Sequence, residues 1–366
     1  MRVLGFGTYD TSVHPRAGVL LQGLAERGAT VRELDRPLGL STADRVDMLR
    51  RPWLLPRLAA RLASRWAGLV DGSFAFAGER APDVVVVGYL GHFDVLLARA
   101  LFPRATLVLD HLIFAASTAR DRGVDGRLRG GALTALDRVA TGAADVVVVD
   151  TEEHAELAAP AVRERTVVVP VGAPDAWAEA GRNRAGSSGG TPSIAFYGLF
   201  TPLQGTVTIA RALAELHRRG TELRVTMVGT GQDHAEARAV LAGVPGIEWL
   251  DWVAPEKLPD LVAAHDIGLG IFGDTDKGLR VVPNKVYQSL AAGCAVVTSD
   301  TPPQRRFLGD AALLVPPGDP AALADALGAL IDDPAAVADL RAWASERARD
   351  LTPSAVVGPL WDVLTA

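Results

Sequence analysis

The stretch DVVVVGYL, residues 83–90, places four valines in a row after an aspartate. Polar and apolar residues do not alternate in it, and β-branched residues favour extended backbone, so the run predicts a strand that is buried on both faces. Such strands occur in parallel sheets that helices cover on each side. Other runs of this texture lie in the first half of the chain: Val3–Phe6, Thr30–Leu34, Ala105–Asp110, Asp145–Asp150 and Thr166–Val171.

Segments with helical spacing fill the intervals between these runs. In residues 17–27 the leucines recur at helical intervals, and the segment ends at Gly28, which suits the left-handed residue after a helix. Strands that alternate with helices indicate an α/β fold with a doubly wound sheet. The pattern returns in the second half with further strand candidates: Ser193–Gly198, Leu223–Gly229, Gly246–Trp252, Asp266–Phe272, Ala295–Ser299 and Ala312–Val315.

Residues 173–192 interrupt the pattern with a small, polar segment rich in glycine and serine, which predicts a linker. A chain of 366 residues is long enough for two domains. We therefore expect two Rossmann-like doubly wound domains, 1–172 and 193–352, that face a cleft. Ligands of such sheets bind beyond the carboxyl ends of the strands, here in the cleft. The last segment, 353–366, has apolar residues at helical spacing and could complete the first domain.

The composition is that of a globular protein, with 49% hydrophobic and 22% charged residues. A formal charge of −6 argues against a general nucleic-acid-binding protein. The single cysteine, Cys294, excludes an intrachain disulfide and fits a reducing compartment. The apolar run at the N-terminus is too short for a signal peptide, and no segment approaches the length of about 18 apolar residues that a membrane span needs. We therefore expect a cytoplasmic protein.

One segment has the composition of a membrane-surface helix. Residues 48–70 place leucines and a tryptophan on one helical face and Arg57, Arg61 and Arg65 in a row beside it. The first interpretation is a helix that faces the core and has a solvated basic back. The alternative is a helix that lies on an anionic membrane, or that reaches a membrane-bound acceptor. Peripheral contact with a membrane through 48–70 therefore stays open.

Candidate phosphate-binding turns lie in the second half of the chain. The segment IAFYGLFTPLQG runs from a strand into a turn with Gly198 and Gly205, and a helix is predicted from about Thr206. A second turn, VGTG, contains Gly229. Glycines let the backbone approach a ligand closely, and the free N–H groups of a helix start bind phosphate. The first strand is not followed by G-x-G-x-x-G, and the sequence has no P-loop, which argues against a nicotinamide enzyme and a P-loop NTPase.

Three cations surround the start of a helix predicted over residues 283–293. Lys285 falls in its first turn, where the helix dipole disfavours a positive charge, and Lys277 and Arg280 precede it. A phosphate bound among these side chains would explain their clustering. The alternative is that the acidic residues of GDTD, 273–276, neutralise the cations on a solvated loop.

Histidines after predicted strands are the candidates for catalysis. His92, in GYLGHFD, and Asp110 with His111, in LVLDHLIF, lie at the strand ends where ligands bind in such sheets. The alternative for each histidine is a hydrogen-bonded structural role. The histidines show no H-E-x-x-H or other ligand spacing, and the acidic pair in DTD has no evident partner, so we expect no metal site.

Segments in a recognisable order carry a family resemblance: GLFTPLQG at 198–205, LDWVAPEKLPDLVAAHDIGLGIF at 250–272, DKGLRVVPNKVYQSLAAGCAVVTSD at 276–300 and LVPPGDPAALADAL at 314–327. Together they resemble the GT-B glycosyltransferases of family 4, also called glycosyltransferase group 1. The likeness is specific over most of the second domain and looser over the first. It implies a retaining transferase that moves a sugar from a nucleoside-diphosphate donor to an acceptor hydroxyl, without a bound metal or a cofactor. UDP and GDP are the expected nucleotides.

This chain departs from the family pattern at the expected diphosphate contacts. The usual arginine and lysine fall on Leu199 and Gln204, and the usual pair of glutamates falls on Arg280 and Gln288. We expect the cations of segment 277–285 to replace the missing ones. The Gln288 amide could still bond a ribose hydroxyl where a glutamate usually does.

The expected site has two parts. His92, Asp110 and His111 would orient the donor sugar or the acceptor hydroxyl from the first domain, and acceptor choice is expected in loops 10–15, 36–57 and 113–131. The second domain would bind the donor through Gly198, Phe200, Thr201, Gln204, Gly229, Trp252, Val253, Lys277, Arg280, Asn284, Lys285 and Gln288.

Two other functions stay open at this point. One is a sugar-nucleotide 2-epimerase built on the same scaffold. The other is an inactive homologue that binds a sugar nucleotide or a partner enzyme, for which the missing arginine, lysine and glutamates argue.

Overall fold

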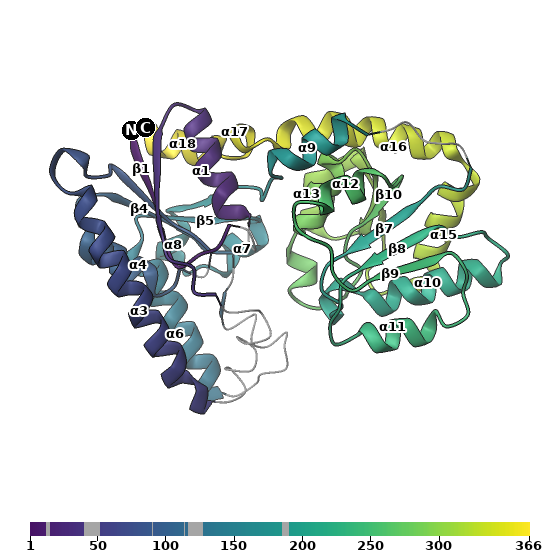
Figure 1. Cartoon of the computed structure of the whole chain (residues 1–366), viewed down its shortest axis with the longest axis horizontal. Helices are drawn as coiled ribbons and strands as arrows, with labels where there is room; N and C mark the ends of the chain where they lie inside the picture. Colours follow the sequence, from purple (N-terminus) through teal and green to yellow (C-terminus); the bar gives the residue numbers. More distant parts are fainter. Residues whose placement is uncertain (12–14, 40–51, 90, 113, 116–126, 185–189) are drawn as a thin grey trace. The chain divides into compact units, whose positions relative to one another are not determined.

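The computed structural model describes the chain except for residues 12–14, 40–51, 90, 113, 116–126 and 185–189 (Figure 1). These ranges include parts of the three expected acceptor loops and the start of segment 48–70, so the expectations for those residues lie outside the described chain. The remainder divides into two units. The first consists of Met1–Pro170 and Pro353–Ala366, and the second of Val171–Thr352.

The first unit is built on a parallel sheet. Within the described residues it has six strands in the order β2-β1-β3-β4-β5-β6. Val3 pairs with Val31 on one side and with Val84 on the other. The strands are β1 (Arg2–Gly7), β2 (Thr30–Asp35), β3 (Val84–Val87), β4 (Thr106–Asp110), β5 (Val146–Val149) and β6 (Thr166–Val168). Each lies within or overlaps a predicted strand, and the predicted α/β fold class is confirmed.

Helices on both faces of this sheet explain the unbroken valine run. Val85 and Val87 belong to one buried cluster, and Val84 and Val86 belong to another. The α-helices described in this unit are α1 (Arg16–Glu26), α3 (Leu55–Ser73), α4 (Asp94–Leu101), α6 (Arg127–Ala143), α7 (Glu152–Leu157), α8 (Pro160–Arg163), α17 (Pro353–Val356) and α18 (Gly358–Thr365). Short 3₁₀ turns lie at Pro52–Leu54, Phe74–Phe76 and Gly78–Arg80.

The second unit repeats this architecture. Its described part has six parallel strands in the order β12-β11-β10-β7-β8-β9. The strands are β7 (Ile194–Tyr197), β8 (Val225–Val228), β9 (Ile247–Leu250), β10 (Ile267–Leu269), β11 (Ala295–Ser299) and β12 (Ala312–Val315). The α-helices are α9 (Asp175–Arg182), α10 (Thr206–Arg218), α11 (His234–Val240), α12 (Leu258–Ala263), α13 (Asn284–Ala291), α14 (Pro302–Leu308), α15 (Pro320–Asp332) and α16 (Pro334–Arg347). Residues 202–204, 278–280, 309–311 and 348–351 form 3₁₀ turns.

The predicted linker, 173–192, is wrong over its first half. Residues Asp175–Arg182 form helix α9 instead. Trp177 on this helix is buried and stacks on Tyr197, with ring centroids 5.6 Å apart. A single tryptophan and small alanines thus give the segment enough apolar surface to pack in the second unit, although its composition is that of a loop.

The C-terminal helices belong to the first unit, where both chain ends lie (Figure 1). Val356, Val357 and Leu360 are buried in the cluster that also contains the core side of α1. The Arg27 side chain donates a hydrogen bond to the Ser354 carbonyl oxygen over 2.7 Å. The first sheet is therefore covered on one face by residues from both ends of the chain.

Helix α3 packs by its C-terminal half. Leu69 is buried in the core, and the Trp66 indole donates to the Asp94 carboxylate over 2.8 Å. Arg57 and Arg61 on the same helix are exposed. Among the described helices, none is long and apolar enough to cross a membrane.

Candidate functional site

The carboxyl ends of four neighbouring strands define one edge of the second sheet. Strands β10, β7, β8 and β9 lie side by side and run parallel, so the residues that follow them meet at this edge. Gly198 follows β7, Gly229 follows β8, Asp251 follows β9, and residues 270–283 lead from β10 to α13. The donor residues predicted from the sequence follow these strands or lie on α13.

Close backbone contacts hold the turns at this edge together. The Gly198 N–H donates to the Val228 carbonyl oxygen over 3.0 Å. Gly229 has a φ of +123°, and a Cβ atom there would overlap the Gly198 carbonyl oxygen. Gly205 precedes α10 with a φ of +67°, and a Cβ atom there would overlap the Phe272 backbone. Both positions therefore need glycine for the packing of turn on turn, apart from any ligand.

Lys285 is the most unusual residue at this edge. It lies in the first turn of α13 and is only 5% exposed. Its Nζ atom lies 3.8 Å from the centroid of the Phe196 ring and has no hydrogen-bond partner among the residues described. A Cβ atom at Gly198 would lie 3.2 Å from this nitrogen, so the ammonium group reaches the turn after β7. Burial lowers the pKa of Lys285 well below its usual value.

Other polar atoms near this turn are also buried without partners in the described chain. They are the Oε1 atom of Gln204 and the hydroxyl oxygen of Thr206. The Gln204 oxygen would lie 3.9 Å from a Cβ atom at Gly198, on which Lys285 also converges. Thr206 is the first residue of α10, a helix of 13 residues with no side-chain cap and no acidic residue in its first turn. This combination can accept an anion.

The remaining predicted donor residues differ in exposure. Trp252 is 74% exposed, whereas Phe200 is fully buried and packs edge-on against Phe196. Lys277 and Arg280, unlike Lys285, lie in a partly exposed loop and 3₁₀ turn and make interactions of their own. The others, Thr201, Val253, Asn284 and Gln288, range from half-buried to exposed. Lys285 is thus distinguished from the other predicted cations by its burial.

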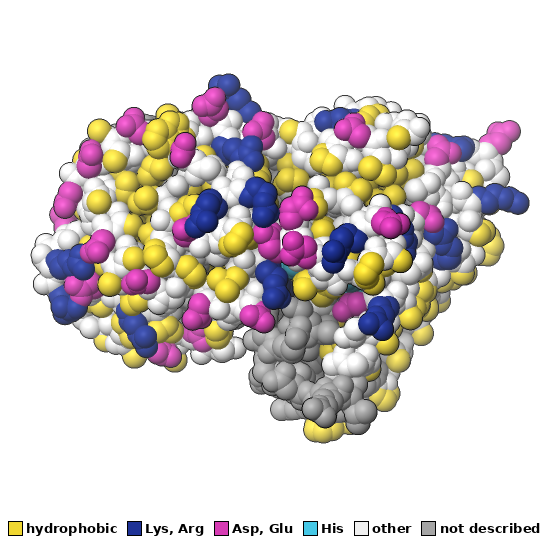
Figure 2. Space-filling model, turned by 180° about the vertical axis from the view of Figure 1, so that it is seen from behind, with side chains coloured by type: hydrophobic (Ala, Val, Ile, Leu, Met, Phe, Trp, Pro, Cys, Tyr) yellow, Lys and Arg dark blue, Asp and Glu magenta, His cyan; other side chains and the backbone are white. Residues whose placement is uncertain are grey.

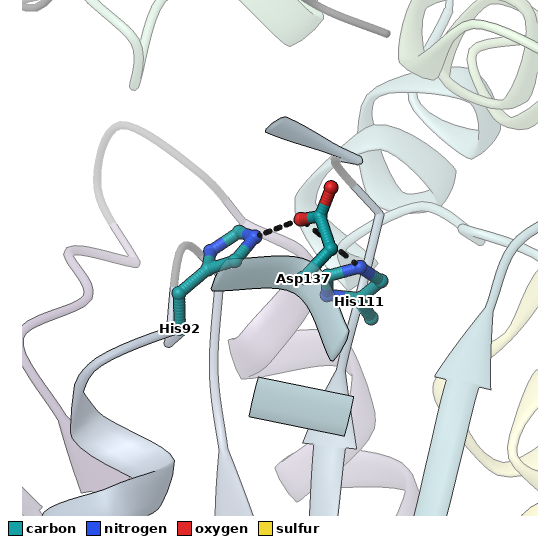
Figure 3. A group of neighbouring side chains, drawn as sticks. All are labelled: His92, His111 and Asp137. Carbon is teal, nitrogen blue, oxygen red and sulfur yellow. Dashed lines mark hydrogen bonds and ion pairs between the residues drawn. The ribbon is translucent and has the colours of Figure 1, made fainter. Parts of the chain in front are cut away.

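A histidine cluster lies at the corresponding edge of the first sheet (Figure 3). His92 follows β3 and His111 follows β4, as predicted, and Asp137 comes from α6. The His92 Nε2 atom lies 2.9 Å from the Asp137 Oδ1 atom, and the His111 Nε2 atom lies 3.7 Å from it. The two imidazole rings meet edge to face, with centroids 4.9 Å apart. All three residues are buried.

His111 stays neutral in this environment. Burial and the neighbouring His92 lower the pKa of His111 to about 3. Its Nε2 atom is buried and has no hydrogen-bond partner among the described residues. A neutral imidazole at this position can exchange a hydrogen bond with a bound ligand.

Asp110 forms a buried ion pair with Arg16 of α1. The Arg16 Nε atom donates to one carboxylate oxygen of Asp110 over 3.0 Å, and the guanidinium group also donates to the carbonyl oxygens of Val169 and Pro170. Burial raises the pKa of the Asp110 carboxyl group, against the lowering effect of Arg16. The second carboxylate oxygen, Oδ2, has no hydrogen-bond partner within the described chain.

Asp137 and Arg16 are site neighbours that were not predicted from the sequence. Asp137 is the one acidic residue in the α6 sequence, and its neighbours in LTALDRVATG give no sign that it faces histidines far away in the chain. Arg16 is the first residue of the apolar helix α1, a position at which an arginine is ordinarily solvated. An acidic residue among apolar ones on a helix was the available signal for Asp137.

Two kinds of bonding fit the His92–His111–Asp137 cluster. The ligand atoms lie within 4.8 Å of one another, so the three side chains could hold a metal ion. The Asp137 Oδ1 atom already accepts hydrogen bonds from His92 and from the Ala115 N–H. A hydrogen-bonded Asp–His pair therefore explains the arrangement more simply.

Charges on the second unit are mixed. On the face shown in Figure 2, basic and acidic side chains are interspersed over this unit, at the left of the view. A nucleic-acid-binding face concentrates basic side chains, which this face does not.

Comparison with known proteins gives a match to one family. Residues 191–333 match the model of the family described as glycosyl transferases group 1. No curated protein sequence matches the chain.

Solved structures resemble the whole chain. The UDP-forming trehalose-phosphate synthase of Burkholderia xenovorans aligns with a TM-score of 0.70 at 15% identity, over 100% of this chain and 98% of that one. Sucrose-phosphate synthase of Thermosynechococcus elongatus gives 0.66 at 16% identity, over 100% and 98%. Anabaena HepE in complex with UDP-glucose gives 0.66 at 14% identity, over 100% and 99%.

Identities this low show the fold alone, and the fold is GT-B, with two doubly wound α/β domains. The match to the family model covers the strands and turns that surround Lys285. Residues 191–333 therefore carry the sequence pattern of the group 1 glycosyl transferases, in a chain that has the GT-B fold.

Proposed function

We propose that this chain is a glycosyltransferase that moves a sugar from a nucleoside-diphosphate sugar to an acceptor hydroxyl group. The observation that carries the proposal is the buried Lys285 ammonium group, which has no hydrogen-bond partner in the described chain and lies within the segment that matches the family model. An unpaired buried cation is costly, and the diphosphate of a donor would supply the missing anion. UDP is the first nucleotide to test, because HepE was crystallised with UDP-glucose, and GDP is the second.

The donor diphosphate would lie between Lys285 and the start of α10. The first-turn N–H groups of α10 and the Thr206 hydroxyl group offer donors, and the helix dipole favours a negative charge there. Lys277 and Arg280 would add longer-range attraction from the neighbouring loop. Gln288 would bond the ribose, and Trp252 and Val253 would contact the base.

Chemistry would consist mainly of charge stabilisation. The bond from the sugar to the diphosphate breaks, a bond to the acceptor oxygen forms, and the acceptor hydroxyl proton passes to the leaving diphosphate. Lys285 and α10 would stabilise the negative charge that develops on the diphosphate. His92, Asp110 and His111 would orient the sugar or the acceptor hydroxyl. We infer retention of the anomeric configuration and metal independence from the resemblance of the motifs, as in the family 4 branch.

A ligand screen followed by a transfer assay tests this function. Thermal-shift measurements against UDP, GDP, ADP and dTDP sugars should identify one nucleotide that raises the apparent stability. Lys285→Ala should lose that shift. Arg224→Ala is the matched control, because Arg224 is an exposed cation before β8, at the opposite edge of the same sheet. Product analysis by mass spectrometry with an acceptor panel should then show sugar transfer.

The same assay separates the two rival functions. Donor binding without transfer to any acceptor would support an inactive homologue, for which the apolar, half-exposed Leu199 at the turn is the argument. Conversion of the donor sugar without an acceptor and without hydrolysis would support an epimerase. If the enzyme needs no metal ion, a chelator should leave the rate of sugar transfer unchanged.

We also propose a cytoplasmic location with peripheral membrane contact through the α3 region. Trp53 and Phe74, at the two ends of α3, are 72% and 75% exposed, and Arg57 and Arg61 lie exposed between them. Aromatic and basic side chains together favour an anionic lipid surface. Flotation with anionic vesicles should recover the wild type, and Trp53→Ala with Arg57→Ala should weaken recovery. Equal recovery of both proteins would contradict this contact.

A further inference from the structure

The Asp137 carboxylate is held in place from two sides. Its Oδ1 atom accepts a hydrogen bond from the Ala115 N–H over 3.0 Å, and it lies 2.9 Å from the His92 Nε2 atom. Asp137 is buried on α6, so its position is set by the helix and by the chain after β4. A carboxylate that is anchored in this way can orient the ring it contacts.

The geometry determines which His92 nitrogen carries the proton. An ionised carboxylate can only accept hydrogen bonds, so His92 must donate from Nε2. In the neutral ring the other nitrogen, Nδ1, is then the acceptor. Figure 3 shows this second nitrogen on the side of the ring away from Asp137. Edge-to-face contact with the His111 ring further limits rotation of His92.

We propose that Asp137 is a positioning residue, which holds His92 with its proton on Nε2 and so presents Nδ1 as an acceptor to a sugar hydroxyl group. This inference rests on the proposed function, because the hydroxyl group belongs to the donor sugar or to the acceptor. It assigns to Asp137 the role that a carboxylate has in many histidine-containing sites, where it selects the tautomer and the ring orientation.

Two substitutions of Asp137 separate charge from hydrogen bonding. Asp137→Ala removes the acceptor for both His92 and Ala115. Asp137→Asn is nearly isosteric, and its side-chain oxygen, still bonded to the Ala115 N–H, can accept from His92. We therefore expect kcat to fall by about 100-fold in Asp137→Ala, with little change in KM for the donor, and by about 10-fold or less in Asp137→Asn.

A buried carboxylate outside this cluster provides the control. Asp266 of the second unit is buried and accepts hydrogen bonds from Arg184 and Ser193. It directly precedes β10, at the edge of the sheet opposite to the turns of the proposed donor site. Asp266→Asn should lower the melting temperature about as much as Asp137→Asn does, but keep kcat within about 2-fold. If kcat followed the loss of stability equally in both variants, Asp137 would have only a structural role.

The tautomer can be measured without any activity. We expect ¹⁵N NMR of histidine-labelled wild-type protein, with the His92 signals assigned through His92→Gln, to show the proton on Nε2 and an unprotonated Nδ1. Asp137→Ala should shift this balance, and Asp137→Asn should keep it. A proton on Nδ1 in the wild type would overturn the inference, as would a stoichiometric metal ion found by elemental analysis.

The two readouts distinguish the possible failures. If no donor or acceptor supports transfer but His92 has the expected tautomer, the proposed function fails and the positioning by Asp137 stands. If transfer is observed and Asp137→Ala keeps full kcat, the positioning role fails and the transferase remains.

Discussion

Lys285 is the residue on which the proposed donor site of the second unit depends. A lysine in the first turn of a helix opposes the helix dipole, and here it is also removed from water. Its contact with the face of the Phe196 ring gives partial compensation through a cation–π interaction. Stability alone does not explain a cation in this position, whereas anion binding does.

Lys285→Met should therefore make the ligand-free protein more stable, by about 1 kcal/mol or more, because it removes an unpaired buried cation and keeps the volume. The effect should depend on pH. The folded-state pKa of Lys285 is lowered, so between that value and about 10.5 the unfolded chain binds the extra proton and wild-type stability rises with pH. The difference in free energy of unfolding between Lys285→Met and the wild type should therefore decrease as the pH rises through this range. Urea unfolding across the pH range measures it, and a destabilised Lys285→Met at every pH would contradict the unpaired cation.

The sequence allowed individual site residues to be placed, but not their contacts. His92, Asp110 and His111 could be predicted at strand ends because a short apolar run locates each strand and a polar residue after it marks the end. Asp137 and Arg16 could not, because their partners are 45 and 94 positions away in the chain. Such pairings depend on how helices lie across the sheet, which local periodicity does not determine.

At the scale of elements, the turns at the edge of the second sheet are shaped by backbone packing. The turns after β7 and β8 touch each other, and glycine at 229 both adopts a positive φ and leaves room for the neighbouring carbonyl group. The contact between these two turns therefore shapes the edge that carries Lys285.

Gly229→Ala should destabilise the protein by more than the usual cost of a positive φ. Gly243→Ala is the matched control, since Gly243 has a φ of +80° and no atom within 4 Å of an added Cβ. We expect the free energy of unfolding to fall by about 1 kcal/mol in the control. It should fall by about 3 kcal/mol or more in Gly229→Ala, where the added atom also meets the Gly198 carbonyl oxygen. Chemical unfolding of the two variants measures the difference. Equal costs would show that the turns can separate without penalty.

Elements were predictable where the pattern was strong. Continuous apolar runs identified central strands such as β3 and β7, in which every residue is buried. Helix α9 was missed, because glycine, serine and arginine around it dominate the local composition and only Trp177 marks its buried face. One large aromatic side chain can decide packing that composition does not reveal.

At the scale of the whole molecule, the chain returns to its first unit at the end. Leu360 of α18 is fully buried, in the same cluster as strand residues of the first sheet. The sequence suggested this possibility through apolar spacing in 353–366. Which unit the segment joins depends on contacts more than 300 positions apart, such as that between Arg27 and Ser354.

Leu360→Ala should destabilise the first unit by about 2–5 kcal/mol, because it leaves a cavity in the core. Leu364→Ala, on the same helix but only partly buried, is the control and should cost less. Hydrogen exchange should show faster exchange in β1 and β3 of Leu360→Ala, with β7 and β8 unchanged. Equal loss of protection in both sheets would mean that the two units unfold as one.

Calorimetric titration of the nucleotide sugar found in the thermal-shift screen measures whether Lys285 binds the donor diphosphate. The wild type should bind one equivalent, and Lys285→Met should bind at least about 30-fold more weakly, although its fold is at least as stable. Arg224→Ala should bind like the wild type. Equal affinity of Lys285→Met and the wild type would contradict the assignment of the diphosphate to the buried lysine, and absence of binding by every nucleotide sugar would contradict the proposed donor site itself.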